Sequence, residues 1–221
     1  MNEPTAPNRI EPRWPVVLAI VVVLIMLEEL PNRIRMLPYG MVYIIGAGML
    51  VSNITVVLAS AKTVWLKVER VATLVFLTLT LTGVLRNQAI IISEMVWHSR
   101  EINGLQLLTS SVAMWVVNVL AFSMLYWQID RGGPVARANN LRPRPDWLFP
   151  QDGIPVEELP PDWRPEFVDY LFLGFCTATA FSPTDVLPLT PCAKMLMMLE
   201  STISLVTIVA VASRAINILG S

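Results

Sequence analysis

The sequence has few of the residues on which most enzymes depend. It contains one histidine, His98, and two cysteines, Cys176 and Cys192. A single histidine without spaced partners offers little for a metal site and removes most acid–base schemes. A glycine-rich phosphate loop, a nucleophile elbow and an HExxH motif are all missing. We therefore expect no enzyme activity, no cofactor and no metal. Two cysteines are also too few for a disulfide framework, so buried free thiols are expected.

Charge is scarce as well. Charged residues make up 15% of the 221 residues, whereas 54% are hydrophobic, and the formal net charge is −1. Mean hydropathy is +0.58. A soluble domain carries about 25% charged residues, and a nucleic-acid-binding protein needs a basic face. The composition therefore excludes nucleic acid as the expected partner. It predicts a multi-pass integral protein of the cell membrane whose immediate partner is the lipid bilayer.

Apolar runs divide the chain into four regions. A polar N-terminal tail (1–13) precedes a four-span membrane region (14–127), with spans expected at 14–30, 39–59, 71–85 and 105–127. The third span has an alternative start at Val64, and 89–97 is either a helical extension or an interfacial helix. Tyr126 and Trp127 fit membrane-interface anchors. A proline-rich aqueous linker (128–166) leads to a last module (167–221). The fold class is all-α, with about five transmembrane helices.

The last module has an unusual layout. The apolar segment from Phe167 to Ala180 is only ~21 Å long as a helix, too short for a ~30 Å hydrocarbon core. The segment from Ala193 to Leu219 is long enough to cross at a tilt. Irregular backbone at membrane depth is tolerated only where it is buried in protein or faces water. The pattern predicts a half-length helix, a re-entrant pore-like loop and a full-length helix.

This module resembles the pore module of the potassium-channel superfamily, whose filter reads roughly T-x-T-T-V-G-Y-G-D. Thr177, Thr179 and Asp185 match the two threonines and the aspartate, and DVLPLTP and Leu199–Glu200 resemble the turn and early inner helix of prokaryotic members. Ser182 and Thr184 replace the two glycines. The filter-like loop comprises Thr177, Thr179, Ala180, Phe181, Ser182, Pro183, Thr184 and Asp185. The resemblance implies a homotetramer around a cation pore, and Pro183 at the tyrosine position predicts a non-standard filter.

A polar stripe follows the last helix at spacings of 4, 3, 7 and 3 residues, which places its members on one helical face. Its members are Glu200, Ser204, Thr207, Arg214 and Asn217. Polar residues in a membrane helix face either a water-filled path or the interior of a helix bundle. Pore lining and hydrogen bonding between helices both remain open at this point.

Together these patterns predict an ion-channel-like membrane protein that passes cations through an oligomeric pore, with monovalent cations as candidates. The main alternative is a non-conducting membrane scaffold or interaction protein that keeps a pore-like fold. A third is a transporter or intramembrane enzyme that uses Glu94, Glu200 and Arg214. Orientation stays open, because the distribution of lysine and arginine favours a cytoplasmic N-terminus and the channel resemblance requires the opposite.

Overall fold

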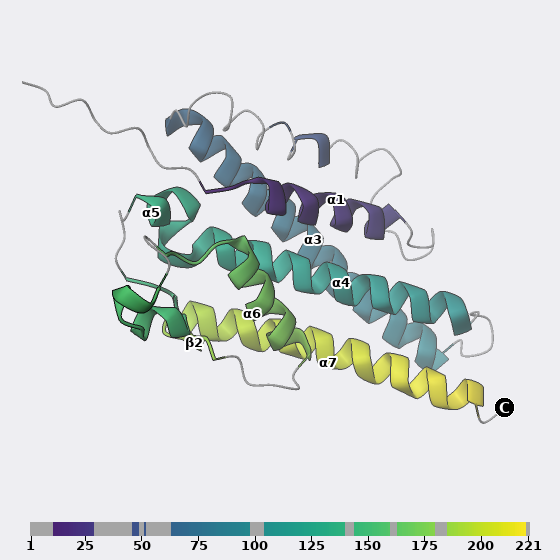
Figure 1. The fold of residues 1–221 in the computed structure, drawn as a ribbon. Helices are drawn as coiled ribbons and strands as arrows, with labels where there is room; N and C mark the ends of the chain where they lie inside the picture. Colours follow the sequence, from purple (N-terminus) through teal and green to yellow (C-terminus); the bar gives the residue numbers. More distant parts are fainter. Residues whose placement is uncertain are drawn as a thin grey trace, which may run out of the picture.

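A computed structural model of the chain describes residues 11–28, 46–48, 51, 63–97, 104–139, 144–159, 163–179 and 185–219. Five helices of this part lie together in one bundle (Figure 1). They are α1 (Trp14–Glu28), α3 (Thr63–Trp97), α4 (Gly104–Ile129), α6 (Phe167–Thr179) and α7 (Pro191–Leu219). Among the described residues, three stretches are long and apolar enough to cross a membrane: Arg70–Ile90, Leu108–Gly132 and Pro191–Ala212. The helices α1 and α6 are shorter apolar helices.

These helices confirm the prediction of a helical fold, but several of them begin or end at other residues than predicted. Segment 89–97 proves to be a continuous extension of α3, which also takes in the charged segment that begins at Thr63. No proline interrupts residues 63–97, so the helix continues through them. The predicted span at 39–59 lies outside the described residues except for 46–48 and 51, which are helical.

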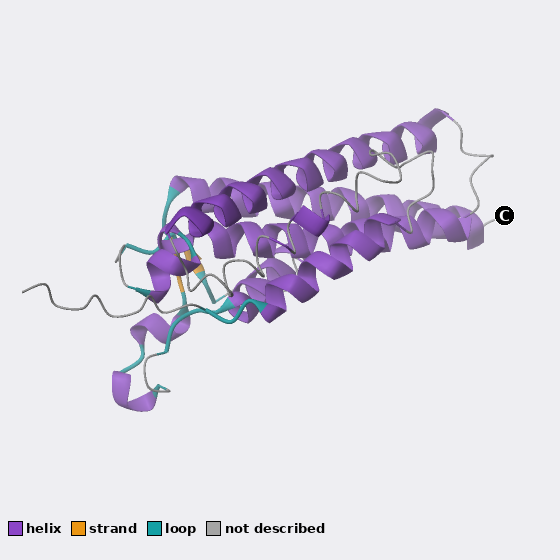
Figure 2. Ribbon diagram, turned by 90° about the horizontal axis from the view of Figure 1, so that it is seen from above, coloured by secondary structure: helices purple, strands orange, loops and turns teal. Residues whose placement is uncertain are grey.

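The helix α4 is the centre of the bundle, because it packs against α1, α3, α6 and α7. Its inward side chains Val117, Ala121 and Phe122 have no exposed surface. Contacts near both of its ends show that α3 runs antiparallel to it, since Arg70 bonds to the Gly132 carbonyl and the Asn87 amide contacts the Met114 sulfur. The helix α7 is also antiparallel to α4, and the view from above shows the long helices side by side (Figure 2).

A polar cap closes one end of the bundle, and we use this name for residues 130–139, 144–159, 163–166 and 185–190. Its short elements are η1 (Asp130–Gly132), α5 (Pro134–Ala138), β1 (Trp147–Leu148), η2 (Pro150–Gly153), η3 (Val156–Glu158) and β2 (Leu187–Pro188). The strands β1 and β2 pair antiparallel, with Trp147 opposite Pro188. Gly133, at a φ of +99°, turns the chain away from α4, a conformation that favours glycine.

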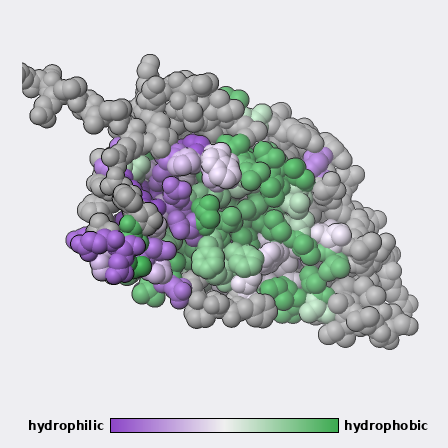
Figure 3. Space-filling model, in the orientation of Figure 1, coloured by the Kyte–Doolittle hydropathy of each residue, from purple (hydrophilic) through white to green (hydrophobic). Residues whose placement is uncertain are grey.

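Surface polarity follows this division between bundle and cap. Figure 3 shows a continuous apolar surface over the bundle and hydrophilic side chains gathered at the cap end. Exposed apolar side chains are abundant on α7, where Met195, Met198 and Leu205 are each about 60% exposed. A soluble protein rarely leaves so large an apolar surface in water. The distribution fits the predicted membrane protein.

Two phenylalanines test this packing. Phe122 on α4 has no exposed surface, whereas Phe172 on α6 is 59% exposed. Phe122→Ala should lower the free energy of unfolding by about 3–5 kcal/mol, since it leaves a cavity in the centre of the bundle. Phe172→Ala should cost much less, because it opens no cavity. Thermal or denaturant unfolding in detergent measures both, and equal losses would contradict the central position of α4.

Candidate functional site

The half-length helix α6 runs from the cap into the bundle. At its start, Phe167 packs edge-on against Trp127, with ring centroids 6.2 Å apart. Near its end, the Thr177 carbonyl accepts a hydrogen bond of 3.1 Å from Ser201 Oγ on α7. Ser201 lies about ten residues into α7, or ~15 Å along that helix. The chain is back at the cap by Asp185, just before β2.

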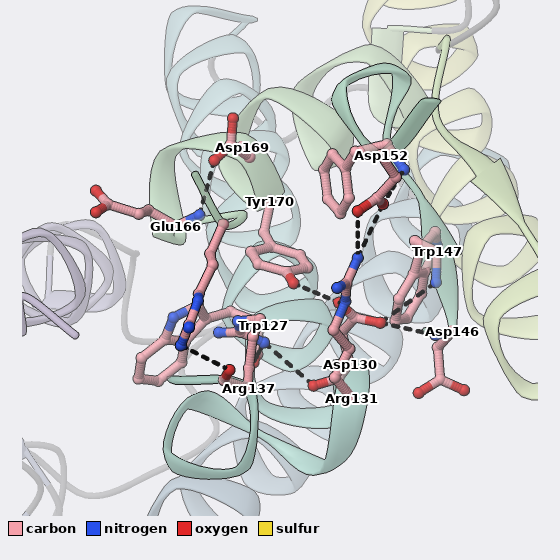
Figure 4. A network of polar contacts seen from close by, with 12 residues as sticks. Trp127, Asp130, Arg131, Arg137, Asp146, Trp147, Asp152, Glu166, Asp169 and Tyr170 are labelled. Atoms are coloured by element: carbon pink, nitrogen blue, oxygen red, sulfur yellow. Dashed lines mark hydrogen bonds and ion pairs between the residues drawn. The ribbon is translucent and has the colours of Figure 1, made fainter. Parts of the chain in front are cut away.

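A buried carboxylate fixes the start of α6. Asp130 follows the end of α4 and has no exposed surface. Its Oδ1 accepts hydrogen bonds from the backbone N–H groups of Asp146 (2.7 Å) and Trp147 (3.3 Å), and its Oδ2 accepts one from the Tyr170 hydroxyl (Figure 4). One side chain therefore joins α4, β1 and the first turns of α6.

The cap also sets the start of α7. The Thr190 hydroxyl donates to Asp146 Oδ1 at 2.8 Å and accepts from the Ala193 N–H at 3.2 Å, which caps the helix. The buried Arg137 guanidinium completes the cap: it forms two hydrogen bonds with Glu11, at 2.8 and 2.9 Å, and its charge lies 4.8 Å from the Tyr170 ring centre. The first turns of α6 and α7 thus have fixed positions relative to the end of α4.

The predicted stripe on α7 faces the inside of the chain. Glu200, Ser204 and Thr207 are at most 3% exposed. The Tyr126 hydroxyl on α4 donates to Glu200 Oε2, and the Asn118 amide donates to Ser204 Oγ at 2.9 Å. One turn further along α7, the Gln88 amide of α3 donates to Thr207 Oγ1.

These contacts decide between the two interpretations for Glu200, Ser204 and Thr207. In the single chain they form hydrogen bonds between helices and do not line an open surface, so the pore-lining interpretation is corrected for all three. The physical reason is that α3 and α4 supply buried polar partners, while the apolar faces of α7 point outward. Arg214 and Asn217 also belong to α7 but lie beyond the side chains that the structure describes.

The filter-like residues are divided between two places. Thr177 and Thr179 lie at the end of α6, where their hydroxyls bond to carbonyls one turn earlier. Asp185 is exposed at the cap. The other predicted members of the loop lie outside the described residues: Ala180, Phe181, Ser182, Pro183 and Thr184.

Three helices meet at Gly174. A Cβ at this position would stand 2.4 Å from Ser123 Oγ on α4, and 3.3 Å from both Glu200 Oε1 and the Val119 carbonyl oxygen. Only a glycine lets α6 lie this close to α4 beside the Glu200 carboxyl. Gly174 is not among the predicted site residues, although a lone glycine in an apolar helical pattern is a signal of close packing.

Other sequence predictions need correction here. Tyr126 and Trp127 are fully buried and are not membrane-interface anchors. Their polar atoms bond to Glu200 and Glu11, and the cap covers them. Cys176 is a buried free thiol as expected, but Cys192, also free, is exposed.

Comparisons with models of protein families, with curated proteins and with solved structures find no match for this chain. Its function is therefore inferred from the geometry of α4, α6, α7 and the cap.

The role of Asp130 can be tested by truncation. Asp130→Ala removes the acceptor of two backbone N–H groups and of the Tyr170 hydroxyl, so we expect a loss of about 3 kcal/mol or more in unfolding free energy. Asp152→Ala is the control, because it breaks a more exposed pair with Arg131 and should cost about 1 kcal/mol or less. Chemical unfolding in detergent compares them, and a loss no larger than that of the control would refute the anchoring role.

The close approach at Gly174 gives a second test. Gly174→Ala should destabilise the fold by about 1–3 kcal/mol, because the added methyl group collides with Ser123 Oγ. Adding Ser123→Ala should recover part of the loss. Gly153→Ala is the control, since a Cβ there meets nothing within 4 Å. If thermal unfolding shows the same midpoint for Gly174→Ala and Gly153→Ala, α6 does not pack on α4 as described.

Proposed function

We propose that the chain is an ion-channel-like membrane protein whose pore module consists of α4, α6, α7 and the segment between α6 and α7. The hydrogen bond between Ser201 Oγ and the Thr177 carbonyl supports this most directly. It places the end of α6 ~15 Å along α7, while Asp185 is again at the cap. Six peptide steps from Thr179 to Asp185 reach at most ~22 Å, which is enough for the return. The positions of these two ends support a re-entrant course for the segment between them.

A re-entrant path is suited to conduction. Peptide groups that stop partway through a bilayer need protein or water around them, and cation filters use carbonyl groups in this position. Thr177 and Thr179 lie at the entrance to the segment from the α6 side, and exposed Asp185 supplies negative charge at its cap side. We propose that the permeant ions are monovalent cations. Ser182 and Thr184 in place of glycines make the filter non-standard.

The pore requires several copies around a symmetry axis, and we propose a homotetramer in the cell membrane. Since the polar face of α7 closes the single chain, the opposite face is available to line the axis. Its exposed residues include Met198, Thr202, Leu205 and Val209. A lumen lined by this face is mostly apolar and would gate by dewetting, with Thr202 as a polar interruption.

The same face favours a second candidate, a non-conducting membrane scaffold. Between Met195 and Ala212 the only charged residue is Glu200, and it is buried. The outward face of α7 therefore offers ions no charge, but it suits lipid or another apolar helix.

Recordings from purified protein in lipid bilayers distinguish the two candidates. The channel proposal expects cation currents that Thr179→Ala changes severalfold in conductance or selectivity, since this hydroxyl lies at the entrance to the loop. Thr78→Ala is the matched control: its hydroxyl, exposed on α3, also bonds to a carbonyl four residues earlier, and it should leave currents unchanged.

The assembly is measured on the same samples. A tetramer that conducts supports the pore. A monomer without a symmetry axis, or a correctly assembled protein that stays silent, would contradict it and favour the scaffold.

A further inference from the structure

The carboxyl of Glu200 is the most enclosed acidic group of the bundle that the structure describes. It has no exposed surface and lies where α4, α6 and α7 meet. Its Oε2 accepts a hydrogen bond from the Tyr126 hydroxyl. Its Oε1 is buried and has no hydrogen-bond partner among the described residues. A buried carboxyl oxygen without a donor is costly, so the site lacks something that would complete it.

No positively charged side chain of the described surroundings balances this carboxyl. Among the side chains that the structure describes on α3, α4, α6 and α7, the other titratable or charged groups are Arg70, Arg86, Tyr126, Asp169, Tyr170, Cys176, Cys192 and Lys194. Tyr126 alone among these hydrogen-bonds to Glu200. Arg86 and Lys194 are exposed, Arg70 bonds to a cap carbonyl, and Tyr170 bonds to Asp130. An ionised Glu200 would stand in an apolar bundle without a counter-charge, at a cost of several kcal/mol.

A bound metal cation does not fit this place. Hard cations need about six oxygen ligands at 2.0–2.6 Å. Three oxygens do converge beside Gly174, from Ser123, Val119 and Glu200, but the point they surround lies against the Gly174 backbone. The helix α6 therefore already fills the space that an ion would need. A proton needs no such space.

We propose that Glu200 is a proton-binding site that holds the three helices together. At neutral pH its carboxyl carries a proton taken from water; the protonated oxygen is a donor and the other accepts from Tyr126. Ser123 Oγ and the Val119 carbonyl oxygen lie beside Gly174 together with Oε1, and the Ser123 hydroxyl donates its own proton to that carbonyl at 2.7 Å. Loss of the proton returns it to water and leaves a buried negative charge, which draws water between α4 and α6. This site needs no pore, so it stands independently of the channel proposal.

The site also adjoins the end of α6. Ser201, the residue after Glu200, holds the Thr177 carbonyl. Ionisation of Glu200 should therefore loosen the contact between Ser201 on α7 and the Thr177 carbonyl on α6.

Infrared spectroscopy of the full chain in lipid at pH 7 tests the site directly. The difference between wild type and Glu200→Gln should contain the C=O band of a protonated carboxyl. Glu157→Gln, at an exposed position in the cap, is the matched control and should remove only carboxylate bands. Loss of carboxylate bands in Glu200→Gln would overturn the proposal. If Glu200→Gln is not recovered folded, the wild-type spectrum decides: the absence of any protonated-carboxyl band at pH 7 overturns it.

The pH dependence of stability is a second readout. A proton held in the folded state and released on unfolding makes the protein less stable as pH rises. As long as Glu200 stays protonated in the folded state, the unfolding equilibrium constant of the wild-type protein should rise with each pH unit. The rise per pH unit should be about tenfold larger than in Glu200→Gln. Denaturant unfolding in detergent at several pH values between about 6 and 8 measures the difference. If the unfolding free energy of the two proteins changes equally with pH, the proposal is overturned.

Discussion

The carboxylate of Asp130 is the contact on which the arrangement of the last module depends. Its hydrogen bonds join the end of α4 to β1 and to Tyr170 in α6. Through Asp146 and Thr190 the same network reaches the first turn of α7. A helix of 13 residues cannot fix its own position in a bilayer, since it presents no second end to the opposite interface. The contacts with the cap fix the start of α6, and the hydrogen bond from Ser201 fixes its end within the bundle.

The sequence predicts the helices well because long apolar runs indicate helices directly. It places α4 and α6 within two residues of their observed ends. It predicts α3 less well, since charged residues near Lys67 suggest a connection where the helix continues. The pairing of β1 with β2 is beyond sequence reasoning, because strands of two residues carry no periodicity. The division into cap and bundle follows from proline and charge content, but the contacts inside the cap do not.

The candidate site shows where periodicity stops being informative. Helical spacing correctly places Glu200, Ser204 and Thr207 on one face. Which neighbour that face meets depends on Tyr126 and Asn118 in another helix, and no spacing within α7 contains this information. Tyr126 has the sequence position of an interface aromatic and becomes a buried partner only because the cap folds over it. Asp130 likewise reads as an ordinary residue of a linker.

The two faces of α7 have different surroundings. The side chains on its polar face already have partners inside the chain. Hydrogen bonds between helices act there in place of the hydrophobic effect, which lipid does not supply. Its apolar face remains open to lipid or to further copies. A polar group introduced on the outward face, for instance at Leu205, should therefore change contacts with lipid or with another copy while the fold persists. Loss of a polar partner on the inner face should affect the fold first. Any oligomeric pore lined by α7 would then depend on shape and on the segment after α6, because Glu200, the one ionisable residue between Met195 and Ala212, is already enclosed within each copy.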